Sequence, residues 1–402
     1  MLLLFAALRR LMPERPALIA AALFAIHPAQ AEPVVSIFAR AIVLATVLCL
    51  ASLWLWLKGR HWAATAAFGV ALLAKEECVA FPLFLLLLTL SISRNRREFV
   101  PVGAMLGLSL AAGMRVLLAT RSVEGAGFGA SVSPFEYWLA QGVAIPRYLQ
   151  LLVLPHGFTV DPAISVAGYG AVGWLALAAS VVWALRAFPH ARLGFWWIAG
   201  LVLLLPSSSI FPADDLAADR RLYLPLIAWA PVAGLALERR RLALLASLAL
   251  ALVALSVGRC TVWRSEQALW TEAARRAPEK VRPRIHLARL APPDRALAIL
   301  EEARQQAPED PRVFAELGRV HLARRDPGAA LADFGRALAL EPRNPSAWNN
   351  RGLAFLLLGD RENAAHDFRR ALEIDPCHAQ ARDNLAQVGG EPPAPCPLLD
   401  KP

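Results

Sequence analysis

Long apolar runs separated by short polar breaks fill the chain from its start to Gly258. A membrane-spanning helix needs about 20 mostly apolar residues to cross a hydrocarbon core of about 30 Å. Four runs reach or approach that length, at residues 34–57, 99–119, 171–187 and 241–258. Shorter runs lie at residues 17–27, 62–74, 79–92, 193–206 and 221–237, and Met1 to Leu8 has the composition of the end of another span. The pattern predicts an all-α fold that begins with a polytopic transmembrane helical bundle over residues 1–258.

The pattern changes after Arg259, where charged residues and alanine replace the apolar runs. Two windows that start 34 residues apart, at Pro311 and Pro345, carry the signature of the tetratricopeptide repeat (TPR), a pair of packed helices. The matching positions are Phe314, Leu317, Gly318, His321, Ala330, Phe334, Ala337 and Pro342 in the first window, and Trp348, Gly352, Phe355, Ala364, Phe368, Ala371 and Pro376 in the second. Arg351 replaces the usual leucine of the second window.

A degenerate unit precedes these windows at about residues 277–310, and its first helix looks shortened. Its second helix is marked by Ala296, Leu300, Ala303 and Pro308. We expect this unit and the units 311–344 and 345–378 to form a TPR α-solenoid within residues 259–388, followed by a disordered tail at 389–402. Such stacks present a concave surface to other proteins, so we expect a polypeptide partner.

Basic residues between the apolar runs set the expected orientation, because short positive loops face the cytoplasm. Five such loops contain Arg9 to Arg15, Lys58 to Arg60, Arg94 to Arg97, Arg186 to Arg192, and Arg239 to Arg241. All five are cytoplasmic under strict alternation if the segment Pro134–Leu154 lies on the outer surface instead of crossing. The chain then emerges outside after Gly258. We therefore expect a multi-pass protein, most simply of a bacterial inner membrane, with an extracytoplasmic TPR domain.

The segment Pro134–Leu154 has features of a surface helix. It contains Glu136, Gln141, Arg147 and Gln150, and Pro146 interrupts it. Its start, from Ser133 to Glu136, has the form of a capping box with proline at the first helical position.

Composition agrees with a lipid-embedded chain. Of 402 residues, 57% are hydrophobic and 18% charged, against about a quarter charged in soluble domains. The net charge of +10 resides mainly in the short loops, so we expect no nucleic-acid partner. The five cysteines show no metal-binding spacing, and whether Cys377 pairs with Cys396 stays open.

Charged residues beside membrane spans are costly and indicate function by default. Four polar clusters fall on the expected outer side: His27 to Glu32 with Arg40; Lys75 to Glu77; Arg147 to Asp161; and Asp214 to Pro225. Structural explanations stay open for each: Glu32 as a helix cap paired with Arg40, Lys75 with Glu76 as a solvated loop, Asp214 with Asp215 as a solvated turn, Asp219 paired with Arg220, and His156 as a loop histidine.

The chemistry of these clusters favours a phosphate-bearing ligand, because guanidinium groups bind phosphate oxygens in pairs. A lipid-linked sugar phosphate has that chemistry. Paired carboxylates could hold a divalent metal, but no ligand spacing requires one. Several short apolar runs end at a proline or a charge, namely Pro28, Lys75 and Pro206, which is typical of broken helices around a cavity.

Together these stretches resemble the transmembrane and TPR-containing protein O-mannosyltransferases and their bacterial relatives, in the GT-C glycosyltransferase superfamily. The similar segments are Ala25 to Arg40 with its His-Pro and Glu32, Ala74-Lys75-Glu76 with Pro82, Arg147-Tyr148-Leu149 to Pro155-His156-Gly157, Leu205-Pro206, and Asp219 to Pro225. The resemblance runs from the start of the chain to the end of the repeats.

The resemblance implies transfer of a sugar, typically mannose, from a polyprenyl-phosphate donor to protein hydroxyls outside the cytoplasm. It implies lipid-phosphate or sugar contacts by His27, Arg40, Lys75, Glu76, Arg147, His156, Arg220 and Tyr223. The family's catalytic acid lies in a first outer loop, whereas this chain starts inside a later span. We therefore expect weak sugar transfer. Glu32 and Asp219 are kept as candidate catalytic groups. The alternative is a non-catalytic, membrane-anchored TPR scaffold for envelope assembly, and a transporter is a third possibility.

Overall fold

The computed structural model describes residues 1–37, 39–93, 96–120, 132–164, 169–187, 192–208, 215–393 and 396. Asp214, the basic residue Arg94 and most of the predicted tail lie outside these residues. The described chain is all-α and forms two compact units, Met1–Leu269 (unit 1) and Trp270–Pro402 (unit 2). The predicted domain boundary after residue 258 falls inside a helix that continues to Val262.

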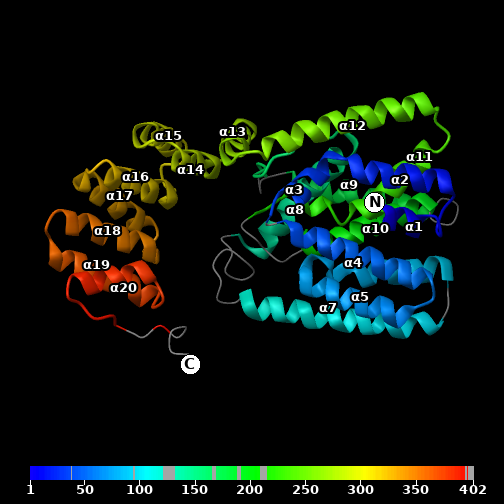
Figure 1. The fold of residues 1–402 in the computed structure, drawn as a ribbon, viewed down its shortest axis with the longest axis horizontal. Coiled ribbons are helices and arrows are strands. Elements are labelled where there is room, and N and C mark those ends of the chain that lie inside the picture. The colour runs from blue at the N-terminus through cyan, green and yellow to red at the C-terminus, as the bar shows by residue number, and fades with distance from the viewer. Residues whose placement is uncertain are drawn as a thin grey trace. The chain divides into compact units, whose positions relative to one another are not determined.

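Unit 1 consists mainly of α-helices, which are joined by 3-10 turns and by loops of different length (Figure 1). Its α-helices are α1 (Leu2–Leu8), α2 (Glu14–Ile26), α3 (Ala31–Val35), α4 (Arg40–Leu57), α5 (His61–Ala74), α6 (Phe81–Leu88), α7 (Phe99–Thr120), α8 (Pro134–Val153), α9 (Gly170–Ala187), α10 (Arg192–Leu204), α11 (Leu226–Leu237) and α12 (Leu242–Val262). Short 3-10 turns that matter below are η1 (Pro28–Gln30), η2 (Glu76–Ala80), η6 (Leu205–Ser207) and η7 (Asp219–Leu222).

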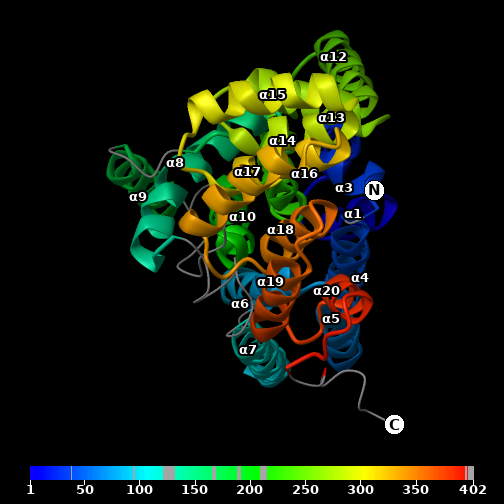
Figure 2. The same cartoon turned by 90° about the vertical axis from the view of Figure 1, so that its left-hand side faces the viewer.

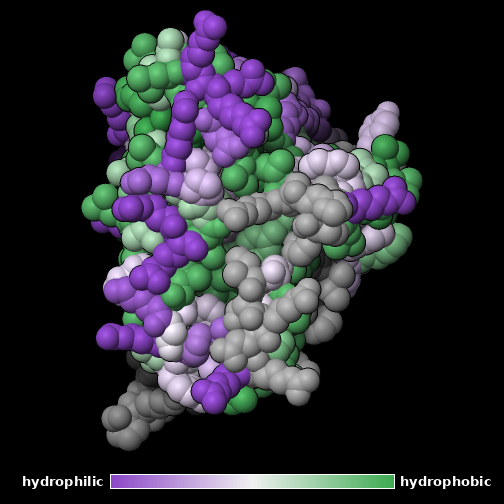
Figure 3. Space-filling model, turned by 90° about the vertical axis from the view of Figure 1, so that its right-hand side faces the viewer, coloured by the Kyte–Doolittle hydropathy of each residue, from purple (hydrophilic) through white to green (hydrophobic). Residues whose placement is uncertain are grey.

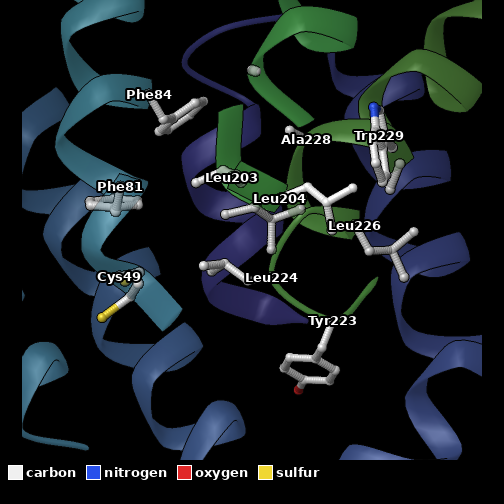
Figure 4. Close-up of a cluster of buried hydrophobic side chains, with 14 of the residues drawn as sticks. Cys49, Phe81, Phe84, Leu203, Leu204, Tyr223, Leu224, Leu226, Ala228 and Trp229 are labelled. Carbon is white, nitrogen blue, oxygen red and sulfur yellow. The ribbon is translucent and has the colours of Figure 1, made fainter. Parts of the chain in front are cut away.

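The core of unit 1 is a single large cluster of buried apolar side chains. Helix α4 packs along α5, α5 packs against α7, and α2 packs against α11. Figure 4 shows part of the centre, where Phe81 and Phe84 of α6 face Leu203 and Leu204 of α10. Because these side chains come from segments far apart in the sequence, the cluster holds the turns at the helix ends in place.

Within the described residues, three helices are long and apolar enough to cross a membrane: Arg40–Leu57, Phe99–Ala119 and Leu242–Val262. A fourth candidate is the pair Glu14–Ile26 and Pro28–Val35, which is bent by 52°. The bend changes the predicted spans, because residues 34 and 35 belong to α3 and the next long helix starts only at Arg40. Proline at position 28, which has no backbone N–H, explains the break after α2.

Helix α8 starts with the predicted capping box. The hydroxyl of Ser133 accepts a hydrogen bond from the backbone N–H of Glu136 (3.3 Å), and the Glu136 carboxylate accepts one from the backbone N–H of Ser133 (2.9 Å). Pro134 occupies the first turn, and Pro146 lies inside the helix. The capping prediction is confirmed.

Unit 2 is a succession of short helices (Figure 2), and from residue 281 to residue 387 each helix packs on the next. They are α13 (Glu266–Arg276), which begins before the division between the units, α14 (Val281–Leu290), α15 (Pro293–Gln306), α16 (Pro311–Ala323), α17 (Pro327–Leu340), α18 (Pro345–Leu357), α19 (Arg361–Ile374) and α20 (Ala379–Gln387). The predicted repeats 311–344 and 345–378 correspond to the pairs α16–α17 and α18–α19. The degenerate unit has the expected short first helix, α14, of 10 residues against 13 in α16 and α18.

The signature residues of the repeats pack as their sizes require. A Cβ atom added to Gly318 would lie 2.8 Å from the ring of Phe334, and one added to Gly352 would lie 2.6 Å from the ring of Phe368. Both rings are fully buried. Glycine at these two positions therefore lets the helices of each pair approach closely.

The departure at Arg351 has a structural cause. Its guanidinium forms two hydrogen bonds with the carboxylate of Asp367 (2.7 and 2.9 Å), which is 1% exposed, and it lies over the Trp348 ring. The repeat before places Asp333 at the equivalent position, and there the partner is His321 (2.7 Å). Each repeat thus pairs an acid at the same position with a different basic side chain.

Two parts of unit 2 were missed by the sequence analysis. Trp270, Ala273 and Pro278 in and after α13 have the spacing of Phe334, Ala337 and Pro342, which is typical of the second helix of a further repeat. At the other end α20 covers the last pair, and a disulfide joins Cys377 to Cys396. The pairing of these two cysteines, which the sequence left open, is therefore present.

Candidate functional site

A largely buried ion pair in unit 1 joins Arg147, in α8, to Asp219, in η7. The Arg147 guanidinium pairs with both carboxylate oxygens of Asp219 and also donates to the carbonyl oxygen of Gly157 (3.1 Å). The backbone N–H of Thr159 donates to the same carboxylate (2.8 Å). Asp219 is 3% exposed, and its two oxygens are occupied by these donors. This pair holds the loop after α8 against η7.

Glu32 forms the centre of a second group. One of its carboxylate oxygens pairs with Arg220 (3.3 Å), which also pairs with Asp215 (3.5 Å). The other oxygen, Oε2, is buried and has no hydrogen-bond partner among the described residues. Asp219 and Arg259 lie close enough to Glu32 to interact with it electrostatically. Pairing of Glu32 with Arg40 was one open alternative, and the structure pairs Glu32 with Arg220 instead.

Arg259 is a member of this group that the sequence analysis did not include. It belongs to the last turns of α12 and is 8% exposed. Arginine side chains are almost never fully buried unless they are paired. The sequence gave no sign of this burial, because Arg259 stands where the soluble tail was expected to start. Its place beside Glu32 follows only from the packing of α12 against η1 and α3.

His27 lies beside the same group and has both ring nitrogens engaged by backbone groups. Its Nδ1 accepts a hydrogen bond from the N–H of Ala29 (3.2 Å), so Nε2 carries the proton and donates to the carbonyl oxygen of Leu152 (3.3 Å). The ring also contacts the edge of Phe158. In this arrangement His27 caps η1 and ties it to the end of α8.

Lys75 and Glu76 pair with each other (3.0 Å) at the start of η2. Partial burial raises the pKa of Glu76, but hydrogen bonds from its own backbone N–H and from Lys75 outweigh this and leave that pKa below its usual value. Turn η2 packs against η6 and α10, and Glu77 interacts electrostatically with Arg221. This places η2 beside the segment 215–222 without an ion pair from Lys75 to Asp219 or Glu32.

The remaining predicted site residues have few polar contacts. Arg40 is exposed and forms no ion pair with the described residues, and His156 is exposed in the loop after α8. Tyr223 is buried, and its ring packs against Phe24 (centroids 5.8 Å apart). Burial raises the pKa of Tyr223. In Figure 4 its hydroxyl points away from the other labelled side chains.

Two buried tyrosines and Arg221 support the segment that carries Asp219 and Arg220. The guanidinium of Arg221 donates to the backbone carbonyl of Asp215 (2.8 Å) and to the hydroxyl of Tyr137 (3.2 Å). The Tyr148 hydroxyl accepts from the backbone N–H of Ala218 (2.9 Å). Burial raises the pKa of both tyrosines. These contacts fix the backbone on both sides of Asp219. The sequence indicated them only through the position of Tyr148 directly after Arg147.

The structure therefore brings Arg147, Asp219, Arg220 and Glu32 together. We call these four side chains the acid–arginine cluster. Arg40 and Lys75 form no ion pair with these four side chains, and Lys75 pairs with Glu76 instead. Among the described residues no group of three or more His, Cys, Asp or Glu side chains could hold a metal ion.

The opposite end of unit 1 is basic. Arg10 donates to the carbonyl oxygen of Leu57 (3.2 Å), and Arg15 donates to the carbonyl oxygen of Arg240 (2.7 Å). Three of the predicted positive loops thus meet at one end. Figure 3 shows a column of hydrophilic residues beside hydrophobic ones on that face. Helix α2 starts at this end and ends at Ile26, directly before His27, so the basic loops and the acid–arginine cluster lie at opposite ends of the helices.

Unit 2 contains a groove of about 900 Å³. The residues that line it come mainly from the first helices of the repeats, α16 and α18, and from α20. Its floor is polar: the amide of Asn384 donates to that of Asn349 (2.9 Å). Arg289 and Arg319 hold the buried carboxylate of Glu316 from two sides (2.9 and 3.1 Å). Such a surface can offer many hydrogen bonds to an extended chain.

Comparison with known proteins identifies the repeats. Residues 315–379 match the family model described as tetratricopeptide repeat. The chain thus carries TPR-like helical repeats, which are suited to protein–protein interaction. No curated protein matches the chain.

Solved structures with similarity to the chain include TPR proteins. The crystal structure of MamA protein shares 18% identity over 31% of this chain and 69% of that one, with a TM-score of 0.28. YrrB, described as a TPR protein with an unusual peptide-binding site, shares 20% identity over 35% of this chain and 79% of that one, with a TM-score of 0.28. A thermophilic TPR protein of Thermus thermophilus shares 16% identity over 52% of this chain and 97% of that one, with a TM-score of 0.29.

Proposed function

We propose that this chain is a multi-pass membrane protein that binds a polypeptide segment with its TPR repeats outside the cytoplasm. The groove of about 900 Å³ on α16, α18 and α20 carries the proposal. It is polar, it lies on the first helices of successive repeats, and its amide side chains can pair with the N–H and carbonyl groups of an extended peptide.

The membrane placement of unit 1 is supported by the surface of its long helices. Only 17% of the apolar window of Phe99–Ala119 and 11% of that of Leu242–Val262 are buried within the chain. Leu110 (76% exposed) and Leu250 (72% exposed) are examples of the side chains left outside. Apolar surface of this extent on helices of spanning length is stable in lipid.

The orientation is supported by two independent features. Basic loops at one end of a bundle favour the cytoplasmic side, and α12 starts there at Leu242, directly after Arg241, and runs toward the other end. The disulfide between Cys377 and Cys396 is typical of an oxidising compartment. Both features favour a position of unit 2 outside the cytoplasm.

We expect reporter fusions to reveal this topology. Fusions after Arg97 and after Arg241 should have cytoplasmic activity, and fusions after Gly127 and after Pro376 should be extracytoplasmic. Gly127 lies outside the described residues. A cytoplasmic reporter at Pro376 would contradict the proposed orientation.

Binding in the groove is tested with the full chain and a displayed library of random short peptides. Ser346 is exposed and lines the groove, so we expect Ser346→Trp to weaken binding of selected peptides by about tenfold or more through steric exclusion. The control is Ala332→Trp, a similar change at an exposed position of α17 that does not line the groove. Failure to select any peptide, or equal losses in both variants, would count against the groove.

A second candidate function is glycosyl transfer from a polyprenyl-phosphate sugar, and the acid–arginine cluster favours it. The free oxygen of Glu32 would take the proton of an acceptor hydroxyl while the hydroxyl oxygen bonds to the anomeric carbon of the sugar. The bond from that carbon to the phosphate oxygen breaks, and Arg220 with Arg259 stabilises the departing lipid phosphate. Asp219 is less suited to accept the proton, because Arg147 and Thr159 occupy both of its oxygens.

The test is transfer by the purified full chain from polyprenyl-phosphate mannose to a protein acceptor. Glu32→Gln should lower transfer and retain donor binding, because it removes the proton acceptor and keeps the volume of the side chain. Glu238→Gln, at the basic end, is the control. Absence of transfer by the unmodified chain, with peptide binding intact, would leave the non-catalytic TPR scaffold as the function.

A further inference from the structure

An apolar hollow of about 540 Å³ lies between α2 and α12. Leu18 and Leu23 line it from α2, and Leu245 and Ala249 line it from α12. Among the described residues that line it, Arg15 is the one charged side chain. None of the functions proposed above uses this hollow.

The hollow is closed at both ends by contacts between neighbouring segments. At the end near the acid–arginine cluster, the Ser256 hydroxyl donates to the carbonyl oxygen of Ile26 (2.6 Å). At the basic end, Arg15 donates to the carbonyl oxygen of Arg240 (2.7 Å). Between these contacts small side chains such as Ala22, Ala246 and Ala249 line the hollow and leave its space unfilled. The rest of α2 packs tightly on α11, so the hollow opens sideways between α2 and α12.

The ends of the hollow differ in charge. Arg15 is joined at the basic end by Arg239, Arg240 and Arg241, against the single acid Glu238 within that turn. Glu14, next to Arg15, is already paired with Arg9 (3.6 Å). The excess of guanidinium groups suits a phosphate, and the apolar walls suit a hydrocarbon chain.

We propose that this hollow binds one hydrocarbon chain of an anionic phospholipid, whose phosphate lies among Arg15 and Arg239 to Arg241. The inference rests on the proposed membrane placement of unit 1, but it adds a specific lipid site on the face opposite to the proposed sugar-transfer chemistry. The bound chain would fill the space that the side chains of α2 and α12 leave open. The position of α12 against α2 would then depend on the content of anionic lipid in the surrounding leaflet. Helix α12 leads into unit 2.

The experiment measures lipid retained by the full chain in detergent by native mass spectrometry, after addition of dioleoyl phosphatidylglycerol or dioleoyl phosphatidylcholine. We expect preferential retention of phosphatidylglycerol, and a loss of about fivefold in its affinity for Arg15→Gln. Ala249→Phe should abolish retention of both lipids by filling the hollow. The matched controls are Ala251→Phe, on an exposed face of α12, and Arg60→Gln, an exposed basic-loop residue outside the lining.

The outcomes separate this inference from the membrane proposal. Equal retention of the two lipids, or no difference between Ala249→Phe and Ala251→Phe, would show that the retained lipid surrounds the protein without occupying the hollow. Either result would overturn the proposed site. Displacement of phosphatidylglycerol by equimolar polyprenyl phosphate would show that the hollow binds polyprenyl phosphate, and it would overturn the proposed phospholipid site. Recovery of the chain in the soluble fraction without detergent would instead contradict the membrane placement itself.

Discussion

Replacing Asp219 by alanine is expected to lower the free energy of unfolding of unit 1 by about 3–5 kcal/mol. The change leaves the largely buried guanidinium of Arg147, which is 19% exposed, without its carboxylate. It also removes the acceptor for the backbone N–H of Thr159. Both groups lie in the protein interior, where water cannot easily take the place of the lost carboxylate.

The measurement is the midpoint of thermal unfolding of the full chain in detergent, with Glu14→Ala as the control. Glu14 also pairs with an arginine, Arg9, but both side chains are more than half exposed, so its removal should cost about 0–1 kcal/mol. A second variant, Asp219→Ala with Arg147→Leu, should be more stable than Asp219→Ala alone, because it removes the unpaired charge. Equal midpoints for Asp219→Ala and Glu14→Ala would show that the pair contributes little.

Replacing Phe334 by alanine is expected to destabilise the repeat α16–α17 by about 3–5 kcal/mol. The ring is fully buried against Gly318 of the same repeat and clusters with Ala330 and Ala354. Its removal leaves a cavity that the surrounding small side chains cannot fill. Because each repeat of a solenoid is stabilised by its neighbours, the loss should extend to α18.

Hydrogen exchange of the full chain gives the measurement, as loss of amide protection in α16, α17 and α18. Leu357→Ala is the matched control, because Leu357 is 64% exposed at the end of α18 and its truncation leaves no cavity. Unchanged protection in the Phe334→Ala variant would contradict the packing described for the repeat. Protection lost only in α16 and α17 would limit the coupling to a single repeat.

The sequence determined much of the helical architecture because the relevant signals are local. The 34-residue period fixed the pairs α16–α17 and α18–α19, and the box from Ser133 to Glu136 fixed the start of α8. Apolar runs located most of the helices of unit 1, since their composition depends only on neighbouring residues. Errors arose where packing decides where a helix ends. The predicted run 34–57, for example, begins in α3, and the long helix α4 starts only at Arg40.

The partners of the charged residues were decided by the tertiary structure alone. Glu32 and Arg220 are 188 positions apart in the sequence, and Arg147 and Asp219 are 72 apart. Local spacing indicates which charges lie near a helix end, but not which of several nearby charges will pair. For Glu32 the sequence left pairing with Arg40, eight positions ahead, as one open alternative, whereas the packing of α3 against η7 brings Arg220 to it.

The same physical reason governs Arg259, Arg351 and the hollow between α2 and α12. Each depends on the distance between helices that meet only after folding, and that distance follows from side-chain volumes across the whole contact. By itself the sequence determined an all-α chain with apolar helices, TPR repeats and polar helix ends. Only the tertiary structure decided that Asp219 is occupied by Arg147 while Glu32 keeps an oxygen without a hydrogen-bond partner among the described residues.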